Sequence, residues 1–333
     1  MQSTFRGAPK HLELERRIGK IDYLILQIDS KCPHGCEYCF VGEGLNKNPD
    51  GGNLSLERRM GLVKEASDLG ARVVAMPGVG EPLATPKIEE LIMFITSLGM
   101  ISIVYSKGML VNRKICDFLA EQDTTVILSI DSLYRETALR LNPNPRGWFE
   151  RAMANVGYIR ERFVPLAETI GEYRVHRLAV NHMVNRMNYG QQDEIRNWCG
   201  EDILFVAHGP SREGHAIRIW DKLAGTPKEH ASLIAYANKI SETGGNTTAR
   251  LDGKCAYYLN GITVSDNGDV KMCPAATKTA GLIGNAKNQS LTELFDLTQL
   301  IVLSKYGNNP PPCLVRDIGY GSLAGQLLQH RTL

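Results

Sequence analysis

The sequence has no apolar run long enough to cross a membrane. Its longest apolar stretch, residues 91–104, is interrupted by Thr96, Ser97, Gly99 and Ser102. It therefore falls short of the roughly 18 consecutive apolar residues that a membrane-spanning helix needs. The amino-terminal residues also lack a continuous apolar core, so no secretory signal peptide is expected. These absences predict a cytoplasmic protein with no membrane partner.

The sequence also has little net charge. Its 38 Lys and Arg residues are nearly balanced by 36 Asp and Glu residues, which leaves a net charge of +2. A protein that binds nucleic acid non-specifically carries a basic surface, so no nucleic-acid partner is expected. The 333 residues, 43% hydrophobic and 22% charged, are typical of a globular protein with one large domain and room for a small appendage.

The positions of the cysteines are more informative than their number. In a reducing compartment the eight cysteines are expected to be thiols, which indicates metal binding or catalysis. Cys32, Cys36 and Cys39 form a C-x3-C-x2-C pattern. Three thiols cannot form a complete set of disulfides, but three thiolates can hold one face of an iron–sulfur cluster. One iron of a four-iron cluster would then have no protein ligand.

Zinc is the competing metal for this loop. A structural zinc site usually has four protein ligands, and His34 could supply the fourth. However, Pro33 and Gly35 on either side of His34 indicate a turn, and we expect His34 to be exposed at the surface. The loop follows a short apolar run at residues 24–28 that predicts a buried strand.

The cysteine pattern, with Tyr38 directly before the last cysteine, resembles the signature of radical S-adenosylmethionine enzymes. The resemblance implies that Cys32, Cys36 and Cys39 hold a [4Fe–4S] cluster whose open iron binds S-adenosylmethionine. An electron from the cluster would cleave the sulfonium and release a 5′-deoxyadenosyl radical, which abstracts a hydrogen from the substrate. The implied partner is an electron donor such as flavodoxin or ferredoxin.

A second segment supports this resemblance. Residues 78–81 read Gly-Val-Gly-Glu and resemble the family's glycine–glycine–glutamate segment, which binds the methionyl ammonium. Gly78, Gly80 and Glu81 are therefore candidate cofactor-binding residues, and glycine lets a backbone carbonyl approach a ligand closely. The valine departs from the family pattern. The alternative is an ordinary turn into a helix, because a Thr-Pro pair follows at residues 85–86.

Six strands alternate with helices along most of the chain. Expected strands are residues 24–28, 73–76, 102–105, 126–130, 177–182 and 203–207, and expected helices are residues 56–69, 87–98, 113–122, 148–162 and 191–198. Alternating β/α units predict a parallel sheet with right-handed crossovers. The number of units agrees with the partial (β/α)6 TIM-like barrel of the family, an α/β fold whose chemistry lies at the carboxyl ends of the strands.

Polar residues follow several of these strands. The resemblance makes five of them candidate cofactor-binding residues, alongside Tyr38: Ser106, Lys107, Ser129, Asp131 and Asn181. His182 and His208 are candidate catalytic residues, because an imidazole can transfer protons near neutral pH. The alternative for each is a polar residue that caps the next helix.

The last part of the chain predicts a smaller α+β subdomain. We place the boundary between residues 1–245 and 246–333, in a Gly- and Thr-rich linker. A hairpin with an Asn-Gly turn is expected at residues 262–272, and a capping box at residues 290–293 opens a helix. The segment resembles the twitch subdomain, a shortened relative of the SPASM domain. This implies an auxiliary [4Fe–4S] cluster held by Cys255, Cys273 and Cys313, the alternative being three isolated buried thiols.

Motifs of this kind identify the initiating step better than the product. We expect a small polar substrate of the sugar, aminocyclitol or nucleoside type and net oxidation with the auxiliary cluster as electron acceptor, as in the family's aminocyclitol dehydrogenase, in natural-product biosynthesis. The triplet begins at residue 32, which favours a small molecule over a leader-bearing peptide. Alternatives are peptide modification, decarboxylation, epimerisation with Cys199 or Cys116 as hydrogen donor, and a non-catalytic iron–sulfur or zinc module. Cys116 and Cys199 lie within or at the end of expected helices, and we read both as structural thiols.

Overall fold

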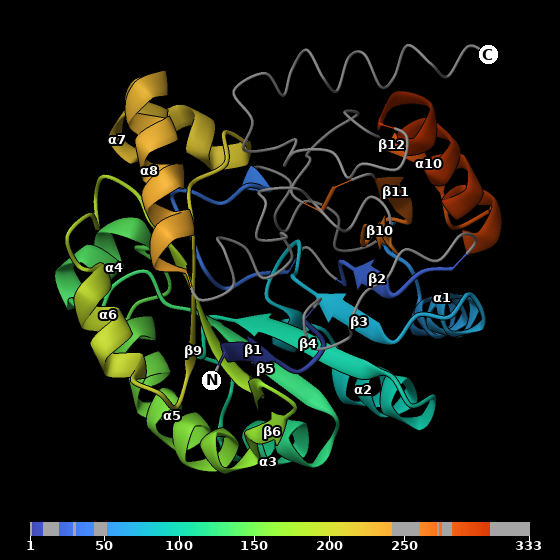
Figure 1. Ribbon diagram of the computed structural model, residues 1–333, viewed down its shortest axis with the longest axis horizontal. Helices are drawn as coiled ribbons and strands as arrows, with labels where there is room; N and C mark the ends of the chain where they lie inside the picture. Colours follow the sequence, from blue (N-terminus) through green and yellow to red (C-terminus); the bar gives the residue numbers. More distant parts are fainter. Residues whose placement is uncertain are drawn as a thin grey trace.

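A mixed α/β fold with one large sheet forms the centre of the computed structural model (Figure 1). The structure describes residues 2–8, 20–28, 31–42, 52–241, 260–271, 273–274 and 282–306. The strands of the large sheet follow the order β12-β11-β10-β2-β3-β4-β5-β8-β9. Because β12 and β9 are its two edges, the sheet is open rather than a closed barrel.

Six neighbouring strands of this sheet are parallel and correspond to the six predicted strands. They are β2 (Tyr23–Leu26), β3 (Val73–Met76), β4 (Ile101–Ser106), β5 (Thr124–Ser129), β8 (Leu178–Met183) and β9 (Leu204–His208). All residues of β2 and β3 are buried. Parallel strands are covered on both faces, which explains why they read as continuous apolar runs. The predicted α/β class is therefore confirmed.

Helices cover the outer face of the sheet that these strands form (Figure 1). They are α1 (Leu56–Asp68), α2 (Ile88–Ser97), α3 (Arg113–Glu121), α4 (Arg135–Leu141), α5 (Trp148–Phe163) and α6 (Gln192–Cys199). Polar residues start two of them: the Ser55 hydroxyl accepts the backbone N–H of Arg58, and the Asn112 side chain accepts that of Ile115. Such caps satisfy backbone donors that have no partner within the helix.

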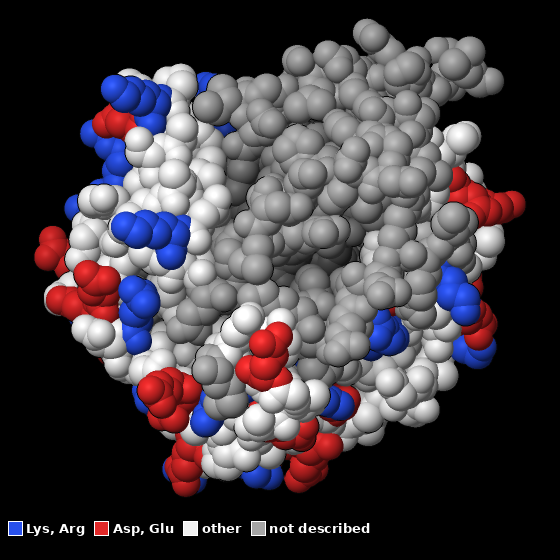
Figure 2. Space-filling view, in the orientation of Figure 1, with Lys and Arg blue, Asp and Glu red and all other residues white. Residues whose placement is uncertain are grey.

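Shorter elements complete this part of the chain. The described residues include the 3-10 turns η2 (Pro82–Ala84), η3 (Val164–Leu166) and η4 (Gly214–Ile219). After η4 come α7 (Trp220–Leu223) and α8 (Pro227–Ile240), and a capping box of Thr226 and Glu229 starts α8. No helix of the described residues has both the length and the apolar composition of a membrane span. Around the margin of the molecule, Lys and Arg side chains lie among Asp and Glu side chains, in agreement with the small net charge (Figure 2).

The carboxyl-terminal strands continue the same sheet. The predicted hairpin is β10 (Gly261–Val264) and β11 (Asp269–Lys271), followed by β12 (Leu282–Asn285) and α10 (Leu291–Tyr306). β10 pairs in parallel with β2, so the hairpin extends the sheet beyond its first strand. The predicted capping box is present at the start of α10. The predicted boundary at residues 245 and 246 lies outside the described residues, and the division into two domains stays a prediction.

A small second sheet lies at the end of the large sheet at which its parallel strands begin. Its strands follow the order β1-β7-β6, from β1 (Gln2–Phe5), β7 (Tyr173–His176) and β6 (Glu168–Ile170). Phe5 is 1% exposed within the main core. The Tyr23 hydroxyl donates to the carbonyl of Gly7 at 2.8 Å. The sequence did not predict this sheet, because β1 pairs with a strand distant in the chain.

Phe5 provides a test of this packing. Replacing a buried phenylalanine by alanine removes apolar contacts and leaves a cavity, so Phe5→Ala should lower the free energy of unfolding by about 3 kcal/mol. Ile170→Ala in the same small sheet is the control, since Ile170 is 44% exposed, and its effect should stay within about 0.5 kcal/mol. Denaturant unfolding followed by circular dichroism measures both. Equal effects would contradict the role of Phe5 in the core.

Candidate cofactor site

The three clustered cysteines lie on one loop after β2. Cys32, Cys36 and Cys39 are half-buried free thiols. Burial raises the pKa of Cys32 to about 12 and that of Cys36 to about 11, and neighbouring thiols add to both shifts. Thiolates here therefore need a cationic partner, and metal binding supplies one as the protons leave. No three His, Cys, Asp or Glu side chains of the described residues already form a metal-binding group.

The connection between α4 and α5 holds one side of this loop. The backbone N–H of Gly35 donates to Oδ1 of Asn142 at 3.0 Å, and the backbone N–H of Glu37 donates to the carbonyl of Leu141 at 3.0 Å. Trp148 braces the connection, since its indole N–H donates to the carbonyl of Asn142 at 2.7 Å. The cysteine loop is thus tied to a segment about a hundred residues later in the chain.

The segment that enters η4 holds the other side. The backbone N–H of His215 donates to the carbonyl of Cys39 at 2.8 Å. Two glycines permit this approach: Gly42 and Gly214 both have positive φ. A Cβ at Gly214 would lie 2.4 Å from the carbonyl oxygen of Cys39, which is closer than any real contact. Only glycine fits there without moving the loop.

His34 is buried, so the expectation of an exposed side chain is wrong. Its Nδ1 lies 3.1 Å from Nδ2 of Asn142, and its ring meets Trp148 edge to face at 5.6 Å. Burial lowers the pKa of His34 to about 3, and the charge of Lys107 adds to the shift. The imidazole is therefore neutral. The turn signals beside it were correct for the backbone, but they carry no information about what packs over the turn.

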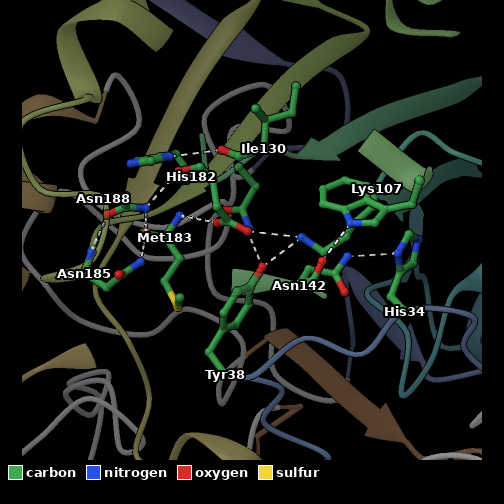
Figure 3. A network of polar contacts seen from close by, with 12 residues as sticks. His34, Tyr38, Lys107, Ile130, Asn142, His182, Met183, Asn185 and Asn188 are labelled. Atoms are coloured by element: carbon green, nitrogen blue, oxygen red, sulfur yellow. Dashed lines mark hydrogen bonds and ion pairs between the residues drawn. The ribbon is translucent and has the colours of Figure 1, made fainter. Parts of the chain in front are cut away.

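Tyr38, Lys107 and Asp131 form a buried polar cluster (Figure 3). The Tyr38 hydroxyl donates to the carboxylate of Asp131, and Nζ of Lys107 lies 3.1 Å from the same carboxylate and 2.8 Å from the hydroxyl. Burial is the largest single effect and acts against both charges, but the partner ion and the neighbouring groups together outweigh it. The pKa of Lys107 is raised and that of Asp131 is lowered. The two side chains are thus an ion pair that fixes Tyr38.

Glu81 stands beside this cluster with one oxygen unpaired. It is 4% exposed, and its Oε2 accepts the backbone N–H of Lys107 at 3.2 Å. Its Oε1 is buried and has no hydrogen-bond partner among the described residues. Burial raises the pKa of Glu81 to about 7, although hydrogen bonds from Lys107 and Ser106 oppose the shift. A buried carboxylate oxygen without a partner is costly, and a cationic group would satisfy it.

The backbone before Glu81 turns sharply. Gly78 has φ +70°, and a Cβ on it would lie 2.2 Å from the carbonyl oxygen of Gly80. The turn places Glu81 directly before η2, where its backbone N–H donates to the carbonyl of Lys31 at 3.0 Å. The candidate glycines thus bring the glutamate against the start of the cysteine loop.

The remaining strand-end candidates lie along the same edge of the sheet. Ser106 is buried and its hydroxyl accepts the backbone N–H of Gly108 at 3.0 Å, while Ser129 is half-buried at the end of β5. Asn181 and His208 face each other, with 3.1 Å between Nδ2 of Asn181 and Nε2 of His208. Nδ1 of His208 lies 2.9 Å from the carbonyl oxygen of Gly209, to which it can donate.

Two candidate catalytic residues, His182 and Cys199, are fully buried. His182 is fully buried, its Nδ1 lies 3.0 Å from the carbonyl of Ile130, and burial lowers its pKa (Figure 3). Cys199 ends α6, which leads into the start of β9, so it lies at the opposite end of the sheet from the cysteine loop. It is buried in the main core, as is Cys116. The structure does not bring Cys199 to the other candidates.

Only part of the predicted auxiliary site is described. Cys255 and Cys313 lie outside the described residues, and Cys273 is a half-buried free thiol. The residue after it, Pro274, accepts a hydrogen bond from Nε2 of Gln27 at 2.7 Å. Gln27 directly follows β2, so Cys273 and the cysteine loop lie at the same edge of the sheet. An auxiliary cluster stays a prediction.

Sequence reasoning missed Asn142 and Trp148, which hold the cysteine loop. Both belong to the Asn-Pro-Asn-Pro-Arg-Gly-Trp segment at residues 142–148, between α4 and α5. Such a Pro- and Asn-rich stretch was a usable loop signal. Nothing in the sequence indicated which other loop it would contact.

The donor set of this edge fits a soft metal cluster and a small cation. Three thiols on one loop offer three ligands, and the unpaired oxygen of Glu81 offers an acceptor next to them. Thiolates are the protein ligands of iron–sulfur clusters. The fit rests on these side chains and on the two loops that hold them.

Comparisons with known proteins support the same conclusion. Residues 27–173 match the family model described as the Radical SAM superfamily. The GTP 3′,8-cyclase of Desulforamulus reducens is 32% identical over 119 residues, which cover 35% of this chain and 36% of that relative. This match therefore spans little more than a third of the relative's length. The GTP 3′,8-cyclase of Clostridium botulinum is 29% identical over 303 residues, covering 84% of this chain and 89% of the relative.

Solved structures show the same fold. The crystal structure of Streptococcus suis SuiB bound to precursor peptide SuiA superposes with a TM-score of 0.60 at 16% identity, covering 92% of this chain and 67% of that one. At this identity the likeness concerns the fold alone. The match of residues 27–173 to the family model, which includes the cysteine loop, identifies a radical S-adenosylmethionine domain in this chain.

Proposed function

We propose that this radical S-adenosylmethionine enzyme abstracts a hydrogen from a small polar substrate of the nucleotide type. The unpaired Oε1 of Glu81, beside the cysteine loop, is the observation that carries the cofactor part of the proposal. The proposed substrate class is supported by relatives whose alignments cover up to 84% of the chain. These relatives are named for a reaction of GTP, which is a nucleotide. The enzyme also needs a reductant, for which we propose flavodoxin or ferredoxin.

Each residue of the edge has a part in this proposal. Cys32, Cys36 and Cys39 would be the three protein ligands of a [4Fe–4S] cluster. Glu81 would accept the ammonium of S-adenosylmethionine through Oε1, and the turn at Gly78, with its positive φ, brings Glu81 beside the cysteine loop. When bound, the cluster and S-adenosylmethionine supply a one-electron cleavage of the sulfonium, which starts hydrogen abstraction.

We propose that Lys107 and Asp131 act through Tyr38 and not by direct contact with the cofactor. Their charges are neutralised by each other, and the pair holds the Tyr38 hydroxyl between them. We therefore propose that they fix the aromatic ring within the cysteine loop. Ser106, Ser129 and Asn181 lie along the same edge and remain proposed contacts of S-adenosylmethionine. His182 and His208 remain proposed proton-transfer residues, and His208 is the more accessible of the two.

The reaction outcome is open to two readings. Net oxidation needs an electron acceptor, and the proposed acceptor is an auxiliary cluster held by Cys255, Cys273 and Cys313. The relatives are named for a cyclisation, which supports a rearrangement of the substrate instead. Among the expected substrates, the nucleoside type is therefore supported by the relatives. Net oxidation has no such support. The cytoplasmic location stays a prediction.

The first prediction concerns the cluster. After anaerobic reconstitution with iron and sulfide, Cys32→Ala should lose about four iron atoms per chain, because a four-iron cluster loses its hold with one ligand missing. The variant should also form no 5′-deoxyadenosine with dithionite and S-adenosylmethionine. Cys116→Ala, which removes a buried core thiol, is the control and should keep its iron. Unchanged iron content in Cys32→Ala would contradict the ligand role.

The second prediction concerns Glu81. Because a hydrogen bond between two charged groups contributes about 1.5–3 kcal/mol, Glu81→Gln should weaken S-adenosylmethionine binding roughly 10- to 100-fold. The wild-type affinity should rise as the pH rises through about 7, since the ionised carboxylate is the binding form and burial raises its pKa to about 7. The affinity of the variant should not follow this pH profile. Equilibrium dialysis with labelled S-adenosylmethionine measures both.

Glu90→Gln is the matched control for that experiment. Glu90 lies exposed on α2, and its removal should leave the affinity unchanged. An affinity of Glu81→Gln equal to that of wild type, at every pH, would show that Glu81 does not accept the ammonium.

The third prediction concerns the substrate. GTP deuterated on its ribose should raise 5′-deoxyadenosine formation above the substrate-free background and transfer deuterium into it. A deuterated aminocyclitol is the comparison. Product mass separates the two outcomes, because a rearrangement keeps the substrate's atoms whereas oxidation removes a pair of hydrogens. If guanine, adenine and pyrimidine nucleotides all fail to stimulate the enzyme, the nucleotide proposal is wrong.

A further inference from the structure

Asn188 lies in the loop that follows β8, where two neighbouring strands of the sheet end (Figure 3). Its side chain is buried, with 0% exposure. We propose that Asn188 is a positioning residue, which fixes the distance between the ends of β5 and β8 and thereby holds Asp131 in place for cofactor binding. This inference rests on the proposed function, in which Asp131 anchors Tyr38.

The backbone pairing of β5 with β8 stops just before the candidate site. The last paired residues are Ser129 and Asn181, and the backbone N–H of Ile130 donates to the carbonyl of Asn181 at 3.3 Å. Asp131 and Met183 lie beyond this point and are both buried. A buried backbone carbonyl that has left the regular pairing of a sheet needs a donor from elsewhere.

The side chain of Asn188 supplies donors to both carbonyls. Its Nδ2 donates to the carbonyl of Asp131 at 2.9 Å and to the carbonyl of Met183 at 2.9 Å. Its Oδ1 accepts the backbone N–H of Asn185 at 2.9 Å, so the amide cannot be turned the other way. One buried side chain therefore bridges the two strand ends beyond the point where their backbones pair.

Asp131 carries this constraint to the cysteine loop. Asn188 holds its backbone carbonyl, and the backbone N–H of Met183 donates to its Oδ1 at 3.3 Å. Its Oδ2 accepts from the Tyr38 hydroxyl and lies 3.1 Å from Nζ of Lys107. A displaced backbone at Asp131 would withdraw the carboxylate from both groups. A site held in one geometry binds its ligand more tightly, because less freedom is lost on binding.

Asn185 offers a comparison within the same loop. It is also 0% exposed, its Nδ2 donates to the carbonyl of Met183 at 3.0 Å, and its Oδ1 accepts the backbone N–H of Met187 at 2.9 Å. Both side-chain hydrogen bonds stay within residues 183–187. If Asn188 only stabilised the loop, the two asparagines would have similar effects. Positioning of Asp131 predicts that Asn188 alone affects cofactor binding.

A double-mutant cycle tests the proposal with full-length, cluster-loaded enzyme. Iron content and the affinity for S-adenosylmethionine are measured for Asn188→Ala, Asp131→Ala and the double variant. We expect Asn188→Ala to keep its iron and to bind S-adenosylmethionine about tenfold more weakly. In the Asp131→Ala background, Asn188→Ala should add nothing further, because both residues act through one carboxylate.

Three further variants separate positioning from general stability. Asn188→Ser keeps a hydroxyl donor and should bind more tightly than Asn188→Ala, and it carries the same test if the alanine variant does not fold. Asn185→Ala should keep the wild-type affinity. Asn260→Ala is the matched control, because Asn260 is a buried asparagine at the opposite edge of the sheet, where its Nδ2 donates to Oδ2 of Asp22 at 2.9 Å. Denaturant unfolding should show a lower midpoint for all four variants, but only the Asn188 variants should lose affinity.

Each contrary result has a distinct meaning. Additive losses in the cycle, equal losses of affinity in Asn185→Ala and Asn188→Ala, or loss of iron in both Asn188 variants would show a purely structural role and overturn the proposal. Wild-type affinity in both Asn188 variants, with a weakened Asp131→Ala, would overturn it while leaving the part of Asp131 intact. Wild-type affinity in Asp131→Ala would overturn what the proposed function assigns to Asp131, and this proposal with it.

Discussion

The candidate cofactor site, at the edge of the sheet that carries the cysteine loop and Glu81, depends on the position of Lys107 between two carboxylates. Its backbone N–H binds Glu81, and its side chain forms the buried ion pair with Asp131 and reaches the Tyr38 hydroxyl. One residue at the end of β4 thereby connects β3, β5 and the cysteine loop. A buried ion pair adds little to stability over apolar packing, but breaking it leaves an unpaired charge. The arrangement therefore favours one geometry of the edge over others.

The parallel strands could be predicted from the sequence because each is a short, continuous apolar run. The register of the small sheet could not, since β1 pairs with β7 across most of the barrel segment and neither strand carries a distinctive pattern. Among site residues, the cysteines and Glu81 stood out through their spacing. Contacts between loops, such as Asn142 with His34, depend on how two chain-distant turns meet, which no local pattern reports.

Cys199 shows a different limit of sequence reasoning. Its residue type suited a hydrogen donor, but its place was already implied by topology, because a helix that leads into a parallel strand ends at the strand's starting edge. In an α/β barrel the chemistry lies at the other edge. Residue type and position in the β/α unit must therefore be considered together.

The parallel pairing of β10 with β2 also affects how the protein would respond to air. β2 lies between β10 and β3, so its backbone is hydrogen-bonded on both sides without any help from a metal. The ties from Gly35 to Asn142 and from His215 to Cys39 likewise involve no sulfur atom. Oxidative destruction of a cluster would therefore remove the iron and sulfide that the cysteines hold. The backbone contacts that position the cysteines would remain. Such damage is reversible in principle, and the same polypeptide can be supplied with iron and sulfide again.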